Sequence, residues 1–157
     1  MKKILNVNNT SNTTDIALLV ARIGIATLML THGIPKLMML LSGAPIQFPP
    51  VMGMSPELSL GLVIFAEVFC SLLLIAGFAT RLAVIPLIIT MLIAALVIHV
   101  ADPFGKQEPS LQYLLVYIVL LFTGSGKYSI DYLLQGKRQI AITTLKPVQD
   151  PTLNIYQ

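Results

Sequence analysis

Charged side chains are scarce in this sequence. Only 11% of the 157 residues are charged and 55% are hydrophobic, whereas about 25% of the residues in an ordinary soluble domain are charged. A folded chain of this length still exposes about a third of the surface of its unfolded state. The few polar residues cannot cover that surface, so the composition excludes a water-soluble domain and predicts that a lipid bilayer surrounds the protein.

Thiols and imidazoles are equally few. Cys70 is the single cysteine, which excludes an intrachain disulfide and a metal site built from cysteines alone, and we expect it to be a small packing residue. His32 and His99 are the only histidines, and their different depths argue against a haem held by both. A metal site that adds Asp102 or Glu108 would lack a close-spaced ligand motif, so we predict no metal.

Basic residues give a net charge of +3 and a pI near 9.1, but they are scattered between apolar runs rather than gathered on one surface. This distribution excludes nucleic acid as the partner and indicates membrane topology instead. The N-terminal apolar run has no convincing cleavage site after it, so we expect it to be retained as an anchor.

Four apolar segments approach the roughly 20 residues that a helix needs to cross a bilayer core of about 30 Å. Gly and Pro mark the connections between them. The fourth segment is short and needs neighbouring residues to cross. The expected spans are Asp15 to Leu41, Glu57 to Phe78, Leu82 to Val100 and Pro109 to Thr123.

These segments predict an all-α fold, an integral membrane four-helix bundle at residues 15–126. A polar segment at 1–14 precedes it, and an amphipathic segment with a tail follows at 127–157. Within the latter, Ser129 to Leu134 is expected to form a short helix in the headgroup layer with Ser129 as its cap, and Ile140 to Leu145 could pair as a strand with a partner.

Lys and Arg gather on one side of the expected bundle, which predicts that both termini are cytoplasmic. The opposite loops hold Lys106 beside three acidic residues. The expected location is therefore the bacterial cytoplasmic (inner) membrane, as a multi-pass protein. The basic residues on the cytoplasmic side are Lys2, Lys3, Arg81, Lys127, Lys137, Arg138 and Lys146.

Five ionisable residues fall inside the expected spans, where each costs about 2.5 to 3.5 kcal/mol to insert. At about 100° per residue, Arg22, His32 and Lys36 share one face of the first span. A buried carboxylate needs a cation, so we predict an ion pair of Arg22 with Glu67 or, failing that, of Lys36 with Glu67. Such a pair could also serve only to fix helix register, and Lys36 could reach the outer headgroups. His99 is expected at the outer end of the third span, five turns from Arg81 and on the same face.

These residues occur in an order that resembles the DoxX family of small four-helix bacterial membrane proteins. Arg22 is followed by Thr31-His32-Gly33-Ile34-Pro35-Lys36, then by Glu67, and then by Gly77-Phe78-Ala79-Thr80-Arg81. His99 closes the third span, and Gly124-Ser125-Gly126-Lys127-Tyr128-Ser129-Ile130-Asp131 resembles the G-x-G-x-x-S-x-D ending of the family. The resemblance covers about Arg22 to Asp131.

The resemblance implies a membrane subunit of a quinone-linked redox complex, at most part of an oxidoreductase, with a soluble redox partner. The chain has no cysteine pair, flavin motif or haem ligand set with which to transfer electrons alone. No cofactor is predicted apart from a quinone, which the bundle could hold. Candidate ligand-binding or proton-handling residues are His32, Lys36, Glu67 and His99, and the catalytic residues are unknown.

Two other functions stay open at this level. Lys36 and His32 could form a cluster that binds or transports a small anion or a lipid head group. The chain could also be a scaffold that anchors a cytoplasmic partner through Lys137 to Gln157. Homo-oligomers could form to cover the polar faces of short helices.

Overall fold

A computed structural model describes residues 11–135 of the chain, and this part is helical, without a strand. Its longest helix, α1 (Ser11–Leu41), includes Pro35. A loop then leads to α2 (Pro56–Ile64). The predicted all-α fold is confirmed for the described residues. Of the polar segment expected at 1–14, residues 1–10 lie outside them and residues 11–14 belong to α1, and the strand considered at 140–145 also lies outside them.

The described residues form four helical rods, of which α1 is the first. The second and third rods each contain a π-helical segment. The second runs through α2, η1 (Phe65–Cys70) and α3 (Ser71–Ala76) without a break. The third consists of α4 (Thr80–Ile93) and η2 (Ala94–Ile98). The fourth rod is α5 (Phe104–Thr123). A turn of helix also occupies residues 130–135, where Ser129 Oγ accepts from the Tyr132 N–H at 3.2 Å as the sequence predicted.

Local sequence signals set the helix ends. Ser55 caps α2 by accepting from the Leu58 N–H at 3.3 Å, and Pro56 occupies the first turn, where its missing N–H costs nothing. Gly77 ends α3 in the left-handed region at φ +66. There Phe78 N–H bonds back to Leu73 O at 3.0 Å, a closure that glycine makes without a Cβ penalty.

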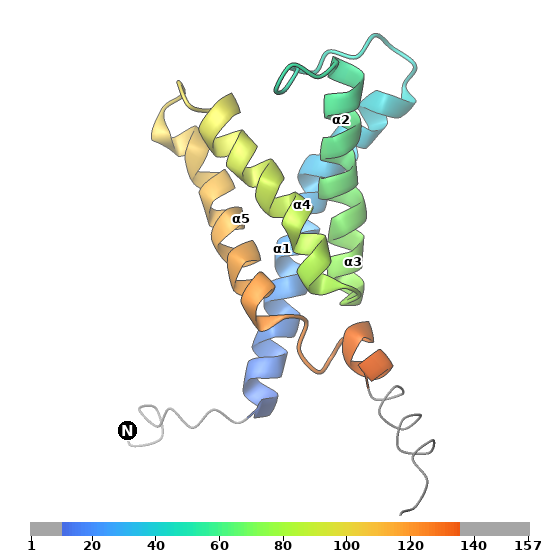
Figure 1. The fold of residues 1–157 in the computed structure, drawn as a ribbon, viewed down its shortest axis with the longest axis vertical. Coiled ribbons are helices and arrows are strands. Elements are labelled where there is room, and N and C mark those ends of the chain that lie inside the picture. The colour runs from blue at the N-terminus through green and yellow to red at the C-terminus, as the bar shows by residue number, and fades with distance from the viewer. Residues whose placement is uncertain (1–10, 136–157) are drawn as a thin grey trace, which may run out of the picture.

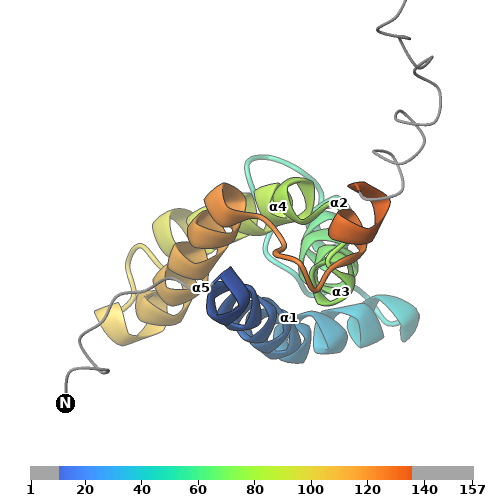
Figure 2. The ribbon, with the colours of Figure 1, turned by 90° about the horizontal axis from the view of Figure 1, so that it is seen from below.

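The chain enters and leaves the described bundle at the same end, which lies at the bottom of Figure 1, while the loop 42–55 and the connection 99–103 lie at the other end. Figure 2 shows the chain after α5 crossing beneath the bundle toward α3. We call the first of these ends, which contains the start of α1, the α3–α4 turn and residues 124–135, the anchor end. The opposite end, which contains the loop 42–55 and the connection 99–103, is called the cavity end.

Small and apolar residues fill the narrow core where α1, α3, α4 and α5 meet. Leu74, Leu87 and Leu120 are fully buried there, and Cys70 packs among them as expected. Many other large apolar side chains are exposed on the outer surface, for example Leu72 at 52% and Leu115 at 65%. An aqueous protein rarely exposes so much apolar surface, which indicates a lipid environment.

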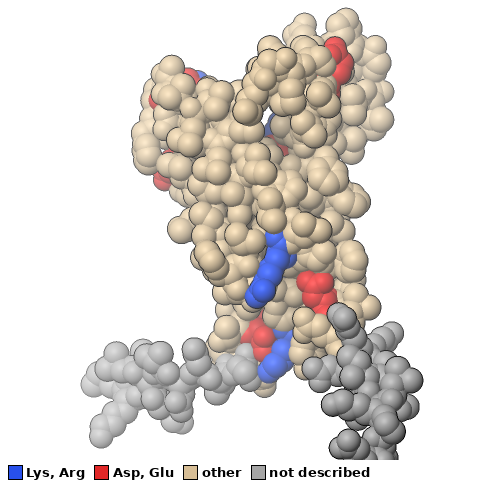
Figure 3. Space-filling view, viewed as in Figure 1, with Lys and Arg blue, Asp and Glu red and all other residues tan. Residues whose placement is uncertain are grey.

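Three of the rods are long and apolar enough to cross a membrane, namely Asn12–Leu41, Pro56–Ala76 and Thr80–Ile98. The fourth begins at Phe104, earlier than the predicted Pro109, because the polar residues before Pro109 are helical as well. On the face drawn in Figure 3, charged side chains lie toward the two ends of the molecule and leave a broad, almost uncharged region between them.

Candidate functional site: an apolar cavity with ionisable walls

A cavity of about 480 Å³ lies between α2–η1 and α4–η2 at the cavity end. Apolar side chains such as Val63, Ile89 and Ile93 form most of its wall. Three of the four candidate residues from the sequence, Lys36, Glu67 and His99, also line it. Its size falls within the range of about 300 to 1,000 Å³ that is usual for small-molecule sites. The combination of apolar walls and a few polar groups is typical of such sites.

Lys36 and Glu67 form an ion pair on this wall. The ammonium Nζ of Lys36 lies 2.5 and 2.6 Å from the two carboxylate oxygens of Glu67. The Glu67 side chain is 4% exposed and the Lys36 side chain 27% exposed. An unpaired charge inside a membrane is costly, and here each side chain supplies the counter-charge of the other. Lys36 remains partly accessible, so its third N–H can reach a ligand in the cavity.

The first choice from the sequence, Arg22 with Glu67, is therefore wrong, and the second, Lys36 with Glu67, describes the observed contact. Depth explains the error. Arg22 lies near the start of α1 and reaches the anchor end, whereas Lys36 lies farther along the same buried stripe and reaches Glu67.

Both π-helical segments border the cavity, and each is associated with one of its ionisable residues. Glu67 is inside η1 (Phe65–Cys70), and His99 directly follows η2 (Ala94–Ile98). A π turn accommodates an extra residue and rotates everything after it around the axis, and such turns are frequent at functional sites. The predicted common face of Arg81 and His99 assumed an unbroken α-helix between them, and η2 interrupts that helix just before His99.

Gly33 brings α1 into close contact with η1 beside Glu67. A Cβ atom at Gly33 would lie 2.8 Å from Val68 Cγ2 and 3.0 Å from Glu67 Cβ, closer than packed carbon atoms approach. The absence of a side chain therefore lets the two helices meet, as small residues do in membrane helix pairs. This contact brings Lys36, one turn later on α1, within reach of Glu67.

His99 is held at the mouth of the cavity by the residues that follow it. Its Nδ1 lies 2.8 Å from Asp102 Oδ2, and Lys106 Nζ donates to Asp102 Oδ1 at 3.3 Å. Gln107 Nε2 donates to His99 O at 2.7 Å. The hydrogen bond from His99, followed by that from Lys106, lowers the pKa of Asp102 below its ordinary value. An ionised carboxylate only accepts, so Nδ1 is the donor of this hydrogen bond and Nε2 is left available to a ligand in the cavity.

His32 does not join this group. It is exposed on the flank of α1, and its ring makes a T-shaped contact with the ring of Tyr113 on α5, with centroids 5.8 Å apart. The expectation that Arg22, His32 and Lys36 share a face therefore holds for Arg22 and Lys36 and fails for His32. Within residues 11–135, no three His, Cys, Asp or Glu side chains gather as metal ligands.

Arg22 is part of a separate polar cluster at the anchor end. Its guanidinium is 1% exposed and donates to Ser125 O at 3.0 Å and to Tyr128 O at 2.7 Å. Gly77 packs directly against it, since a Cβ there would overlap the guanidinium and Ser129 Cβ. Arg22 therefore joins the chain after α5 to α1 and the end of α3.

Asp131, which is also at the anchor end, caps the start of α4 although it lies 52 residues after Ala79 in the sequence. Its carboxylate accepts from Ala79 N at 2.7 Å and from Thr80 N at 3.2 Å, at the start of α4. Its own N–H donates to Gly77 O at 3.0 Å. A carboxylate at a helix N-terminus satisfies free N–H groups and opposes the helix dipole. From the sequence, Asp102 was considered only as a possible metal ligand and Asp131 only as the last residue of the family-like ending. Proximity in sequence to His99 could have pointed to Asp102, whereas no local signal pairs Asp131 with Ala79.

Comparison with known proteins adds one match. The DoxX family model matches residues 17–100, more than half of the chain. The matched range includes Arg22, Gly33, Lys36, Glu67 and His99 but ends before α5 and the Gly124 to Asp131 segment. The searches of curated proteins and of solved structures each gave no match.

Proposed function

The chain belongs to the DoxX family, and we propose that it is the membrane subunit of a quinone-linked redox complex. The redox role is what the resemblance to this family implied. We propose further that the quinone binds in the cavity at Glu67. The observation that carries this proposal is the 480 Å³ cavity with apolar walls and with Lys36, Glu67 and His99 among its lining residues. In this arrangement α5 is the fourth membrane span, and the anchor end faces the cytoplasm by the distribution of Lys and Arg.

The shape of the wall fits an amphiphile with a small polar head and an apolar tail. The ionisable groups can contact the head. Leu62, Phe65 and Ile89 line the cavity and are also about half exposed on the outer surface, so the apolar wall continues to the lipid-facing side of the bundle. A tail can therefore leave the cavity between α2 and α4 and enter the bilayer.

The residues around the head are suited to hydrogen bonding and proton exchange. A bound quinone would supply two-electron chemistry, taking up two protons on reduction and releasing two on oxidation. Lys36 would donate a hydrogen bond to a carbonyl oxygen. Nε2 of His99 would accept a proton and pass it through Asp102 at the mouth. The electrons would come from or go to a partner redox protein, since one buried cysteine cannot form a redox-active dithiol.

A small-anion transporter is less well supported. Lys36, the cation expected to bind the anion, is neutralised by Glu67, and His32 lies away on the α1–α5 flank. The core below the cavity is filled by Leu74, Leu87 and Leu120. The scaffold function rests on residues 137–157, which lie outside the described residues.

Binding of a short-chain ubiquinone to the purified full-length protein tests the proposal. We expect Glu67→Gln to raise the Kd about tenfold, which corresponds to about 1.4 kcal/mol, because Lys36 loses its counter-charge and changes its position. Glu57→Gln is the matched control, since Glu57 is exposed at the same end and lies outside the cavity lining. Isothermal titration calorimetry in a mild detergent gives both values.

Equal affinities for the two variants, or no binding by the wild-type protein, would contradict the proposal. Liposomes that contain this protein alone provide a separate measurement. Anion uptake by such liposomes would favour the transport function, whereas a redox subunit without its partner should leave the anion outside.

A further inference from the structure

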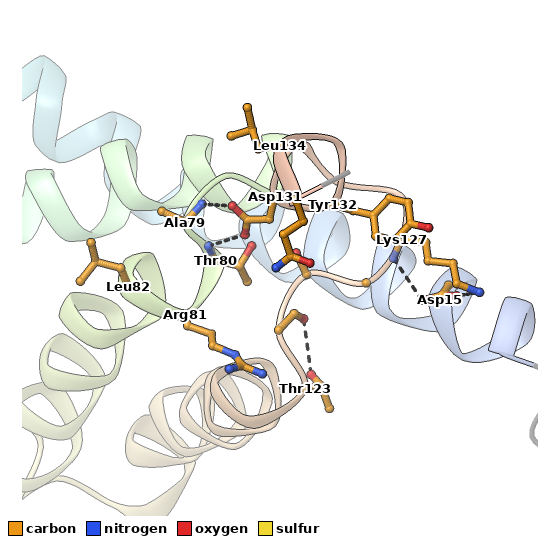
Figure 4. A pocket seen from close by; sticks show the side chains of 14 residues that line it. Asp15, Ala79, Thr80, Arg81, Leu82, Thr123, Lys127, Asp131, Tyr132 and Leu134 are labelled. Atoms are coloured by element: carbon orange, nitrogen blue, oxygen red, sulfur yellow. Dashed lines mark hydrogen bonds and ion pairs between the residues drawn. The ribbon is translucent and has the colours of Figure 1, made fainter. Parts of the chain in front are cut away.

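The anchor end contains a second and larger cavity, of about 760 Å³, that the quinone proposal does not use. Its wall is formed by the first turn of α4, the end of α5, residues 124–127 and the helical turn at 130–135 (Figure 4). We propose that this cavity binds the phosphate group of an anionic phospholipid, with Arg81 as the main contact.

Arg81 is the cation of this cavity that lacks an acidic partner among residues 11–135. Its guanidinium makes one hydrogen bond, from Nη2 to Phe122 O at 3.2 Å, and is exposed. The two acidic residues of the wall are already engaged. Asp15 pairs with Lys127 Nζ at 3.2 Å, and Asp131 caps α4. The planar guanidinium has several donors left and suits a phosphate, which it can bind in a bidentate manner.

Thr80 supplies a second feature that calls for a ligand. Its side chain is on the cavity wall next to Arg81 (Figure 4). The residue is 1% exposed, and its Oγ1 has no hydrogen-bond partner in the described part of the chain. A buried hydroxyl without a partner is unfavourable by about 1 to 3 kcal/mol. Rotation of the Thr80 hydroxyl toward a phosphate oxygen bound at Arg81 would satisfy it.

Lipid-facing side chains next to Arg81 identify the source of the phosphate as a phospholipid. Leu82, one residue after Arg81, is 69% exposed, and Phe122, whose carbonyl Arg81 contacts, is 75% exposed. Ile85 and Ile89 on α4 and Val119 on α5 extend these two apolar rows along the membrane-spanning surface. Acyl chains can lie along the two rows while the phosphate reaches the guanidinium, as at other basic pockets at the ends of membrane helices. A free phosphate would contact only the polar part of this surface and would leave the two apolar rows uncovered.

Native mass spectrometry of the full-length protein tests this site. The protein is reconstituted in nanodiscs of equal parts phosphatidylglycerol and phosphatidylcholine and released into the gas phase. We expect the wild-type protein to retain phosphatidylglycerol at least tenfold over phosphatidylcholine. Arg81→Gln should remove this preference. Lys106→Gln, with the same loss of charge at the cavity end, should keep it, and Arg81→Lys should retain only part of it.

Three results would overturn the proposal. They are equal retention of the two lipids by the wild-type protein, the same loss with Lys106→Gln as with Arg81→Gln, and displacement of the bound lipid by millimolar inorganic phosphate. The wild-type comparison decides the question even if Arg81→Gln does not fold. Quinone affinity should be unchanged in Arg81→Gln, so this proposal and the proposed function can fail separately.

Discussion

Arg22 and Lys36 lie on the same buried stripe of α1, yet they bind different kinds of group at the two ends of the bundle. At the anchor end, Arg22 donates to backbone carbonyls of Ser125 and Tyr128, groups that never change protonation. At the cavity end, Lys36 binds the carboxylate of Glu67, a titratable group at the wall of a cavity. The first arrangement fixes the fold, whereas the second holds charge where a ligand can reach it.

The comparison divides the motif residues of the sequence into two sets. Arg22, Gly77 and Asp131 meet at the anchor end, where Nη1 and Nη2 of Arg22 and the carboxylate of Asp131 bond to main-chain groups and Gly77 packs against Arg22. Lys36 and Glu67 belong to the cavity end. Changes at the anchor should therefore reduce stability, and changes at the cavity should reduce ligand binding.

Arg22→Met is expected to have the largest effect on stability. The substitution keeps an unbranched apolar stem but leaves the carbonyls of Ser125 and Tyr128 without their donors. Each hydrogen bond to a charged group contributes about 1.5 to 3 kcal/mol, so we expect the loss of two such bonds to lower the free energy of unfolding by about 3 to 6 kcal/mol. Unfolding in mixed micelles, followed by circular dichroism, measures this loss.

Arg81→Met, measured in micelles without phospholipid, is the matched control, because Arg81 is an exposed arginine at the same end and its one hydrogen bond, to Phe122 O, is open to solvent. Its cost should stay within about 0.5 kcal/mol. Equal losses in the two variants would show that the anchor end depends on overall positive charge rather than on the hydrogen bonds of Arg22.

Sequence periodicity predicted much of this division but only part of the contacts. Apolar runs located the four rods, and helical phase placed Arg22 and Lys36 on one face. Phase alone did not show which of them reaches Glu67, since that depends on how α1 crosses η1 at Gly33. The acceptors of Arg22 are more than 100 residues away in the sequence and lie in a loop whose backbone conformation leaves no periodic signal.

The π-helical segments were beyond sequence reasoning for a related reason. Phe65–Cys70 and Ala94–Ile98 contain neither proline nor glycine, the residues that usually mark helix irregularities. Their wider turns arise where two rods pack around the cavity. The position of His99 at the cavity mouth therefore follows from tertiary packing rather than from the local sequence.

Gly33→Ala is expected to have an intermediate effect, and it tests the link between helix packing and the cavity. The added Cβ would crowd Val68 and Glu67, so one of the helices must move by a few tenths of an ångström. We expect a loss of about 1 to 2 kcal/mol in the free energy of unfolding, together with weaker quinone binding. The measurements are unfolding in mixed micelles and calorimetric titration.

Gly24→Ala in the same helix is the control. Nothing lies within 4 Å of a Cβ at Gly24, so alanine should stabilise the helix by about 0.5 to 1 kcal/mol. If the two alanine variants behaved alike, the close approach of α1 to η1 at Gly33 would have no energetic consequence.

The smallest expected effect concerns Asp102 at the cavity mouth. Hydrogen bonds from His99 and then Lys106 lower its pKa below the ordinary value of 3.8. A carboxyl group whose pKa is lowered by folding contributes stability above its unfolded pKa, and this contribution is lost as the pH falls through the lowered folded pKa. Asp102 should therefore stay ionised and contribute no pH dependence at pH 5 to 7, and its contribution to stability should decrease as the pH falls below about 5.

Carbon-13 NMR of the carboxyl groups measures this titration directly. In His99→Leu, the largest cause of the shift is removed, so the pKa of Asp102 should rise toward 3.8. Lys106→Gln should raise it by less, because the hydrogen bond from His99 remains. A larger rise in this pKa with Lys106→Gln than with His99→Leu would mean that Lys106 rather than His99 is the main partner of Asp102. Asp102 would then not fix Nδ1 of His99 for proton transfer at Nε2.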